Sequence, residues 1–321
     1  MIKKFDIEIV KNTLDTQAIY NHANEFGFST TKYLITNTEL KVDDFINLNS
    51  IDDIDTSDIK NNLFYLHFNS DDEFLYHLDK IIKNNGKFIN HMNASKFNYV
   101  YSNKNCNLAL TDTLKCINEI SHYDEIIHGN ICQALEQTKH LEGDYIEIGV
   151  YKGGSALTAL NYMKHSNIKR KSYFLDTFDG FDYDEATNSS ETRWRKDNCH
   201  HKLFGVDNTM NYIKTILTRE CPEQEFTLVQ SNICKDELPS NINNIVVANI
   251  DVDIYDATRD SFNKVAEKMV KGGIIIAEDP TSTPCLIGAF YAMENFLETS
   301  IGKKFMKLHL IGQYFLIKIN D

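Results

Sequence analysis

Long apolar runs, paired cysteine motifs and an excess of positive charge are all missing from this sequence. No apolar stretch approaches the roughly 18 residues of a membrane-spanning helix, and charges interrupt the N-terminus where a secretory signal would be continuous. The seven cysteines are scattered and form no Cys-x-x-Cys, which argues against a disulfide framework or a thiolate zinc site. The net charge of −13 disfavours non-specific binding to nucleic acid or to an anionic membrane. We therefore expect a cytoplasmic protein that binds neither nucleic acid nor membrane.

The 321 residues have the composition of a folded globular protein, with 42% hydrophobic and 25% charged residues. After about residue 110, strand-like and helix-like segments alternate, which indicates an α/β fold with a mainly parallel sheet. The first part is richer in Asn, Asp and Lys, and its pattern predicts a helix after Ser70 between strands over 63–68 and 87–89. We predict an N-terminal α/β accessory region over 1–110 and a larger domain over 111–321, and leave a homo-oligomer open.

The larger domain is expected to contain five strands that alternate with helices before a terminal hairpin. The strands cover 145–148, 172–175, 226–230, 245–250 and 274–277, and the helices cover 155–164, 209–219, 256–269 and 285–297. Gly272-Gly273 is expected to end the third of these helices. Runs over 305–311 and 314–319, joined by Gly312-Gln313, have the spacing of a tight antiparallel hairpin. This ending is unusual for a dinucleotide-binding fold and typical of a Rossmann-like class I methyltransferase sheet.

Three carboxylates follow two of the expected strands. Asp251 comes after the strand over 245–250, and the pair Glu278-Asp279 comes after the strand over 274–277. Because the carboxyl ends of parallel strands meet at one edge of the sheet, these acids are expected to lie together. Clustered negative charges need a counter-ion, and hard oxygen ligands favour Mg²⁺, Ca²⁺ or Mn²⁺. On this pattern alone, a metal site and ordinary solvated loop acids are both open interpretations.

A glycine-bearing turn follows the first of the five strands. Glycines at 149, 153 and 154 permit close approach of a ligand to the backbone, and the helix that starts near Ser155 offers free N–H groups. The spacing departs from the dinucleotide fingerprint Gly-x-Gly-x-x-Gly, so a smaller cofactor is favoured over a pyrophosphate, with a turn that binds no ligand as the alternative. Asp176, at the end of the second strand, is placed to accept hydrogen bonds from both hydroxyls of a ribose.

Four motifs, taken in order, resemble the macrocin O-methyltransferase family of S-adenosylmethionine-dependent enzymes. They are Gly-Asp-Tyr-Ile-Glu-Ile-Gly-Val-Tyr-Lys-Gly-Gly-Ser (143–155), Asp-Thr-Phe-Asp-Gly-Phe (176–181), Ile-Asp-Val-Asp-Ile-Tyr-Asp-Ala-Thr (250–258) and Gly-Gly-Ile-Ile-Ile-Ala-Glu-Asp (272–279). The resemblance covers roughly residues 140 to 320 and leaves the N-terminal part unexplained. It implies a class I methyltransferase fold, S-adenosylmethionine as cofactor, and Mg²⁺.

The resemblance also implies roles for individual residues. Those around the cofactor would be Glu147, Gly149, Gly153 and Ser155, with Asp176 on the ribose hydroxyls and Ser231 near the adenine. Those that hold Mg²⁺ would be Asp251, Glu278 and Asp279, with Asp253 able to assist. This sequence departs from the family in two places: Ser231 lies in Gln-Ser-Asn where Glu-Gly is usual, and the acidic pair is Glu-Asp where Asp-Asp is commoner.

The implied reaction is methylation of a hydroxyl on a sugar or sugar-containing acceptor, either a small molecule or a glycan. Mg²⁺, held by Asp251 and its partners, would lower the pKa of the acceptor hydroxyl, and a base would remove its proton as the oxygen attacks the sulfonium methyl. The stretch over 179–208 is polar, aperiodic and too long for an ordinary connection, which predicts a lid or binding loop. The resemblance also implies that a histidine of this loop acts as the base. His200 and His201 are the candidates, and His201 is preferred.

Two other functions remain open at this point. Asp251-Val-Asp253 is an Asp-x-Asp, which in a glycosyltransferase could bind Mn²⁺ and the pyrophosphate of a nucleotide sugar. That interpretation leaves the glycine turn and the Glu278-Asp279 pair unexplained. The second alternative is a binding module that retains the fold with an inactive site.

Overall fold

A computed structural model describes the chain in two compact units, residues 1–115 and 116–321, and each is treated by itself. The described residues are 32–36, 46–55, 59, 63–67, 71–84, 87–90, 103–120, 123–189, 209–278, 280 and 287–320. The division falls after Lys115, whereas the sequence pattern suggested a boundary after residue 110. No helix in these ranges is long and apolar enough to cross a bilayer.

The N-terminal unit contains a four-stranded parallel sheet in the order β2-β1-β3-β4. Its elements are β1 (Lys32–Thr36), β2 (Ile46–Leu48), a 3-10 helix (Ile51–Asp53), β3 (Leu63–His67), α3 (Asp71–Lys83), β4 (Lys87–Asn90) and α4 (Lys104–Lys115). Helix α3 buries Leu75, Leu78, Ile81 and Ile82, which recur at helical spacing along one face. The predicted β3, α3 and β4 are confirmed, while β1 and β2 were not anticipated.

The C-terminal unit contains a seven-stranded sheet in the order β10-β11-β9-β8-β5-β6-β7. The strands are β5 (Asp144–Ile148), β6 (Ser172–Asp176), β7 (Phe226–Gln230), β8 (Ile245–Ile250), β9 (Met269–Ala277), β10 (Phe305–His309) and β11 (Tyr314–Lys318). Strand β11 pairs antiparallel with both of its neighbours, and the pairs among β5 to β9 are parallel. The parallel sheet with a terminal antiparallel hairpin is therefore confirmed.

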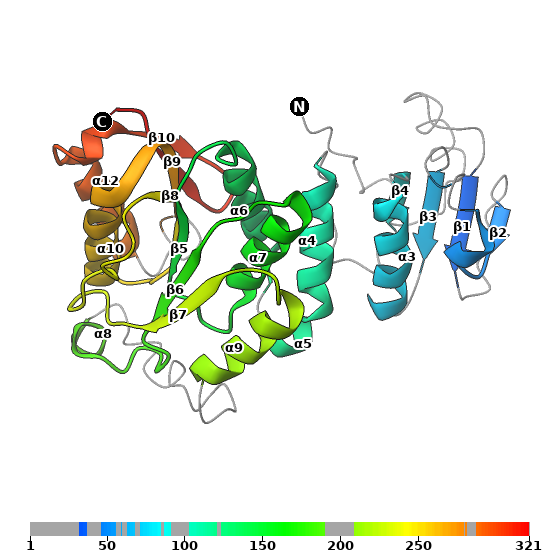
Figure 1. Cartoon of the computed structure of the whole chain (residues 1–321), viewed down its shortest axis with the longest axis horizontal. Coiled ribbons are helices and arrows are strands. Elements are labelled where there is room, and N and C mark those ends of the chain that lie inside the picture. Colours follow the sequence, from blue (N-terminus) through cyan, green and yellow to red (C-terminus); the bar gives the residue numbers. More distant parts are fainter. Residues whose placement is uncertain are drawn as a thin grey trace. The chain divides into compact units, whose positions relative to one another are not determined.

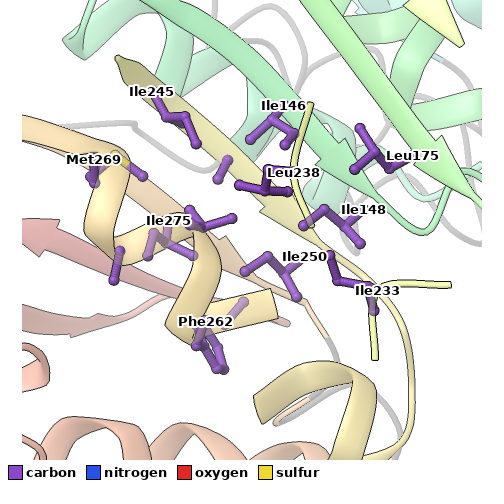
Figure 2. Close-up of a cluster of buried hydrophobic side chains, with 14 of the residues drawn as sticks. Ile146, Ile148, Leu175, Ile233, Leu238, Ile245, Ile250, Phe262, Met269 and Ile275 are labelled. Atoms are coloured by element: carbon purple, nitrogen blue, oxygen red, sulfur yellow. The ribbon is translucent and has the colours of Figure 1, made fainter. Parts of the chain in front are cut away.

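Helices cover both faces of this sheet (Figure 1), with α10 and α12 on one side and α6 and α7 on the other. The helices are α5 (Ile117–Ile120), α6 (Glu125–Gln137), α7 (Gly154–Ser166), α8 (Asp184–Asn188), α9 (Thr209–Glu220), α10 (Tyr255–Lys268), α12 (Ile287–Glu298) and a 3-10 turn over Gly302–Lys304. Because side chains alternate along a strand, each strand supplies both faces. Figure 2 shows part of the core on the α10 face, where Ile250 of β8 lies between Ile148 of β5 and Phe262 of α10.

Three expectations about local structure need correction. Helix α10 ends at Lys268, and Gly272-Gly273 lies inside β9 where its register with β8 shifts. Glycine suits this irregular pairing, because a Cβ at Gly273 would lie 2.9 Å from the Val270 carbonyl oxygen and 3.0 Å from that of Val246. The hairpin loop has four residues, Leu310 to Gln313, with the Leu310 N–H donating to the Gln313 carbonyl at 2.8 Å. The stretch expected to be aperiodic contains α8, whose Ala186 is buried in the core.

Candidate functional site

The carboxyl ends of β5, β6, β8 and β9 meet at one edge of the C-terminal sheet. The backbone N–H of Gly149 donates to the Leu175 carbonyl of β6, that of Asp251 to the Ile148 carbonyl of β5, and that of Glu278 to the Ile250 carbonyl of β8, at 2.9, 2.9 and 3.1 Å. These three residues therefore follow one another across adjacent strands. We call two groups of residues at this edge the turn side and the acid side. The turn side lies at the ends of β5 and β6 and in the segments after β5 and β7, and it consists of Glu147, Gly149, Gly153, Ser155, Asp176 and Ser231. The acid side follows β8 and β9 and precedes β11, and it consists of Asp251, Glu278 and Gln313.

Gly149 is required by the close approach of β5 and β8. Its φ is +89°, and a Cβ built there would lie 1.7 Å from the backbone oxygen of Asp251. No side chain fits this space, so the glycine brings the turn side against the acid side. Gly153, with φ of +83°, immediately precedes the first residue of α7. A Cβ at Gly153 would lie 3.1 Å from the Ile213 side chain, so this position is also crowded.

Glu147 is fully buried on the sheet face that carries α7. Its carboxylate accepts hydrogen bonds from the Tyr145 hydroxyl and from Ser155 Oγ, each at 2.7 Å. Its pKa is raised to about 7, mainly because burial disfavours the charged form; the negative charge of Asp176 acts in the same direction, and the two hydroxyl donors act against it. Asn249 lies beside Glu147 on the neighbouring strand β8 and is fully buried. Its side-chain amide also lowers the pKa of Glu147. Neither amide atom reaches hydrogen-bonding geometry with a partner among the described residues.

Asp176 and Ser231 lie together at the ends of β6 and β7. The Asp176 carboxylate accepts backbone N–H bonds from Val150, Tyr151 and Phe178, and its carbonyl accepts the N–H of Ser231 at 2.8 Å. The Ser231 hydroxyl is buried and has no hydrogen-bond partner in the part of the chain that the structure describes. Since buried polar groups are nearly always satisfied, this hydroxyl is a candidate ligand contact.

The acid side presents oxygen ligands on neighbouring strands. Asp251 and Glu278 follow Ile250 and Ala277, which are paired in the β8–β9 ladder, and both side chains are partly exposed. The Gln313 Nε2 donates to Glu278 Oε2 at 3.4 Å. Asp253 has φ of +65°, a left-handed conformation that is uncommon outside glycine.

Some predicted site residues fall outside the described ranges. Asp279, His200 and His201 belong to this group, together with most of the expected loop over 179–208. No group of three metal-binding side chains occurs within the ranges that are described. The described start of the loop is anchored, because Lys235 Nζ pairs with Asp184 at 2.8 Å and the Asn232 side chain donates to Glu185 at 3.1 Å.

A model of one protein family matches residues 129–315, described as macrocin O-methyltransferase (TylF). This span covers more than half of the chain and includes both sides of the edge. The chain belongs to the macrocin O-methyltransferase family. The resemblance drawn from the four motifs is thereby confirmed.

Individual relatives of this macrocin O-methyltransferase family member are distant. One relative comes from Streptomyces olivaceus and is named 8-demethyl-8-(2,3-dimethoxy-alpha-L-rhamnosyl)-tetracenomycin-C 4'-O-methyltransferase. It is 23% identical over 145 residues, which are 44% of this chain. The match spans 55% of that curated relative, a little over half of its length. Among solved structures, the O-methyltransferase NovP has a TM-score of 0.51 at 15% identity, covering 64% of this chain and 88% of NovP. That likeness confirms the class I methyltransferase fold.

Three buried polar residues around the site were missed from the sequence. Asn249 could have been found, because it interrupts the apolar run over 245–250 just before Asp251. Tyr145 was placed in a strand without a role, and its bond to Glu147 depends on side-chain direction. Gln313 was assigned only to a turn, where residues are usually exposed, yet it is fully buried.

Proposed function

We propose that this protein is an S-adenosylmethionine- and Mg²⁺-dependent O-methyltransferase that acts on a hydroxyl of a sugar or a sugar-containing metabolite. The observation that carries the proposal is the meeting of a glycine turn, Asp176 and two carboxylates at one edge of a family-typical sheet. Open α/β sheets bind their ligands at this edge. The described residues supply donors and acceptors for both a nucleoside cofactor and a hard cation.

The turn side fits S-adenosylmethionine. Gly149 and Gly153 keep the backbone free of side chains where the methionine part would lie, next to the N-terminus of α7 and Ser155. Asp176 would accept from the ribose hydroxyls. The buried Ser231 hydroxyl, which has no partner among the described residues, supports the placement of the adenine near β7.

The acid side fits Mg²⁺ by the chemistry of its donors. Asp251 and Glu278 provide carboxylate oxygens on adjacent strand ends, and Asp279, outside the described residues, is proposed as the third ligand. A cation bound there would supply a Lewis acid that makes an acceptor hydroxyl easier to deprotonate. The protein's own residues would orient that hydroxyl toward the sulfonium methyl, and His201 is proposed as the base that takes its proton.

The acceptor class follows from the relatives. The Streptomyces olivaceus protein is named for methylating a rhamnosyl group. We infer a sugar-bearing acceptor for this chain, either a small molecule or a glycan. The absence of disulfides among the five described cysteines supports a reducing compartment, and we propose the cytoplasm. We also propose that residues 1–110 form an accessory region and residues 111–321 the methyltransferase domain.

The test is methyl transfer from labelled S-adenosylmethionine to a panel of rhamnosyl and other glycosides. We expect transfer with Mg²⁺ and none after chelation. Cofactor binding without transfer to any acceptor would favour an inactive binding module. Binding of a UDP-sugar in a thermal-shift panel would revive the glycosyltransferase interpretation of Asp251-Val-Asp253.

A further inference from the structure

The carboxylate of Asp176 is already heavily hydrogen-bonded by the protein itself. Its Oδ2 accepts the backbone N–H of Val150 at 2.6 Å and that of Tyr151 at 3.1 Å, and its Oδ1 accepts the N–H of Phe178 at 2.8 Å. A carboxylate offers about four acceptor positions, so the backbone takes most of them. The donors come from two loops, the glycine turn after β5 and the segment after β6. Asp176 therefore joins these loops before any ligand is considered.

Two of the three backbone N–H donors have a strained backbone; a fourth donor, the Thr177 hydroxyl, lies 3.5 Å from Oδ1. Tyr151 has φ of +50° and Phe178 has φ of +55°, values that aromatic residues rarely adopt. Tyr151 is 49% exposed, so burial of its ring contributes little to holding it there. Hydrogen bonds from N–H groups to a carboxylate are shorter and stronger than those between neutral groups. The charge of Asp176 thus stabilises the left-handed backbone conformations of Tyr151, after β5, and Phe178, after β6.

We propose that Asp176 is a positioning residue that latches the glycine turn to the end of β6 and holds Tyr151 and Phe178 in their left-handed conformations before the cofactor binds. This role adds to the proposed function. It rests on the proposed function only for the identity of the ligand that binds at the glycine turn. A latched turn presents its N–H groups and glycines in one arrangement, so less conformational freedom is lost on binding. Loss of Asp176 would then affect the protein even in the absence of cofactor.

The test uses the full-length, cofactor-free protein with Asp176→Asn, in which the amide Nδ2 cannot accept an N–H bond. Because the remaining Oδ1 can still accept from one of the two loops, hydrogen exchange should accelerate roughly 10- to 100-fold either at the Val150 and Tyr151 amides or at the Phe178 amide. The Gly149 amide, which bonds to the Leu175 carbonyl, should keep its exchange rate. A residue that only binds ribose would change nothing without cofactor, so unchanged exchange at the three amides would overturn the proposal. Asp184→Asn, at an exposed acid on α8, is the matched control for loss of charge.

A second comparison separates a latch from a general structural role. Tyr151→Gly removes the strain, because glycine adopts positive φ readily. The fall in Tm caused by Asp176→Asn should therefore be smaller in the Tyr151→Gly background than in the wild-type background. An equal fall in both would contradict the latch. If Asp176→Asn does not fold, Asp176→Glu gives the same comparison. A chain that bound no S-adenosylmethionine would refute the proposed function and leave both measurements untouched.

Discussion

The turn side and the acid side of the sheet edge are built differently. On the turn side, short hydrogen bonds within the protein join Glu147 to Ser155 and Asp176 to the loop backbone, at 2.6 to 3.1 Å. On the acid side, Gln313 Nε2 donates to Glu278 Oε2 over a longer distance, 3.4 Å. The difference teaches that the part proposed for the cofactor is preorganised by hydrogen bonds within the chain, whereas the part proposed for the metal places carboxylates at the ends of two adjacent strands.

The most disruptive change should be Gly149→Ala, because Gly149 on the turn side packs directly against the backbone of Asp251 on the acid side. The added Cβ would meet the Asp251 carbonyl oxygen at 1.7 Å, and φ of +89° is unfavourable for alanine. We expect a loss of roughly 4 kcal/mol or more in the free energy of unfolding, measured by urea denaturation. Gly154→Ala, at the first residue of α7, is the control and should stay within about 1 kcal/mol. Similar stability of the two variants would show that β5 and β8 can separate without loss.

Asp251→Asn should separate the two sides functionally. We expect turnover to fall by about 100-fold or more, since the residue proposed to hold Mg²⁺ loses its charge, while the Kd for S-adenosylmethionine changes by less than about 3-fold. Methyl-transfer kinetics and calorimetry measure the two effects. The control is Asp256→Asn on α10, where Asp256 pairs with Arg259. An equal loss of binding and turnover in Asp251→Asn would move Asp251 out of the metal role.

Glu147→Gln should show how much the buried carboxylate lowers the free energy of unfolding at high pH. The pKa of Glu147 is raised from 4.5 to about 7, so the folded state binds its proton more tightly than the unfolded state. The resulting stabilisation is complete below pH 4.5 and is lost as the pH rises through 7. At pH 8 the variant should therefore be more stable than the wild type by roughly 3 kcal/mol, and near pH 4.5 about equal to it. We also expect weaker cofactor binding.

Urea denaturation across this pH range checks the prediction for Glu147. Glu142→Gln, just before β5 and outside the buried network, serves as the control and should show the wild-type pH dependence. If stability of Glu147→Gln fell with pH in parallel with the wild type, the buried carboxyl would not be the source of the dependence.

The smallest expected effect is on the acid side, from Gln313→Ala. Its neutral amide orients the Glu278 carboxylate without cancelling its charge, so its loss should weaken Mg²⁺ binding by about 10-fold. Titration of Mg²⁺ by calorimetry measures this. Asn130→Ala is the matched control, because Asn130 donates to the Ile311 carbonyl of the same hairpin loop. Equal losses in both variants would assign the effect to the hairpin and not to Gln313.

The sequence predicted the strands of the larger sheet because β8 and its neighbours are continuous apolar runs. It also placed Asp176, Asp251 and Glu278 correctly at strand ends, since chain order and parallel topology determine which ends meet. It failed for Gly272-Gly273, because a glycine pair at the end of an apolar helix pattern also fits an irregular strand, and the β8–β9 register shifts between the Ile245–Met269 and Val247–Ile274 pairs.

Contacts that depend on side-chain direction could not be predicted. The bonds of Asp176 to Val150 and Tyr151 join loops about 25 residues apart, and only their geometry reveals that a carboxylate expected to bind ribose also holds the turn. The burial of Gln313 likewise depends on how β11 lies between β9 and β10. In the N-terminal unit, the three-residue strand β2 gave too short a pattern to detect.

The most direct test of the account is calorimetric titration of S-adenosylmethionine into the full chain, with Mg²⁺ and after chelation. If the turn side is preorganised by the protein, S-adenosylmethionine should bind in both conditions with closely similar affinity, while methyl transfer requires the ion. No binding of S-adenosylmethionine in either condition would contradict the proposed function, and binding only with Mg²⁺ would contradict the division between a preformed turn side and a separate acid side.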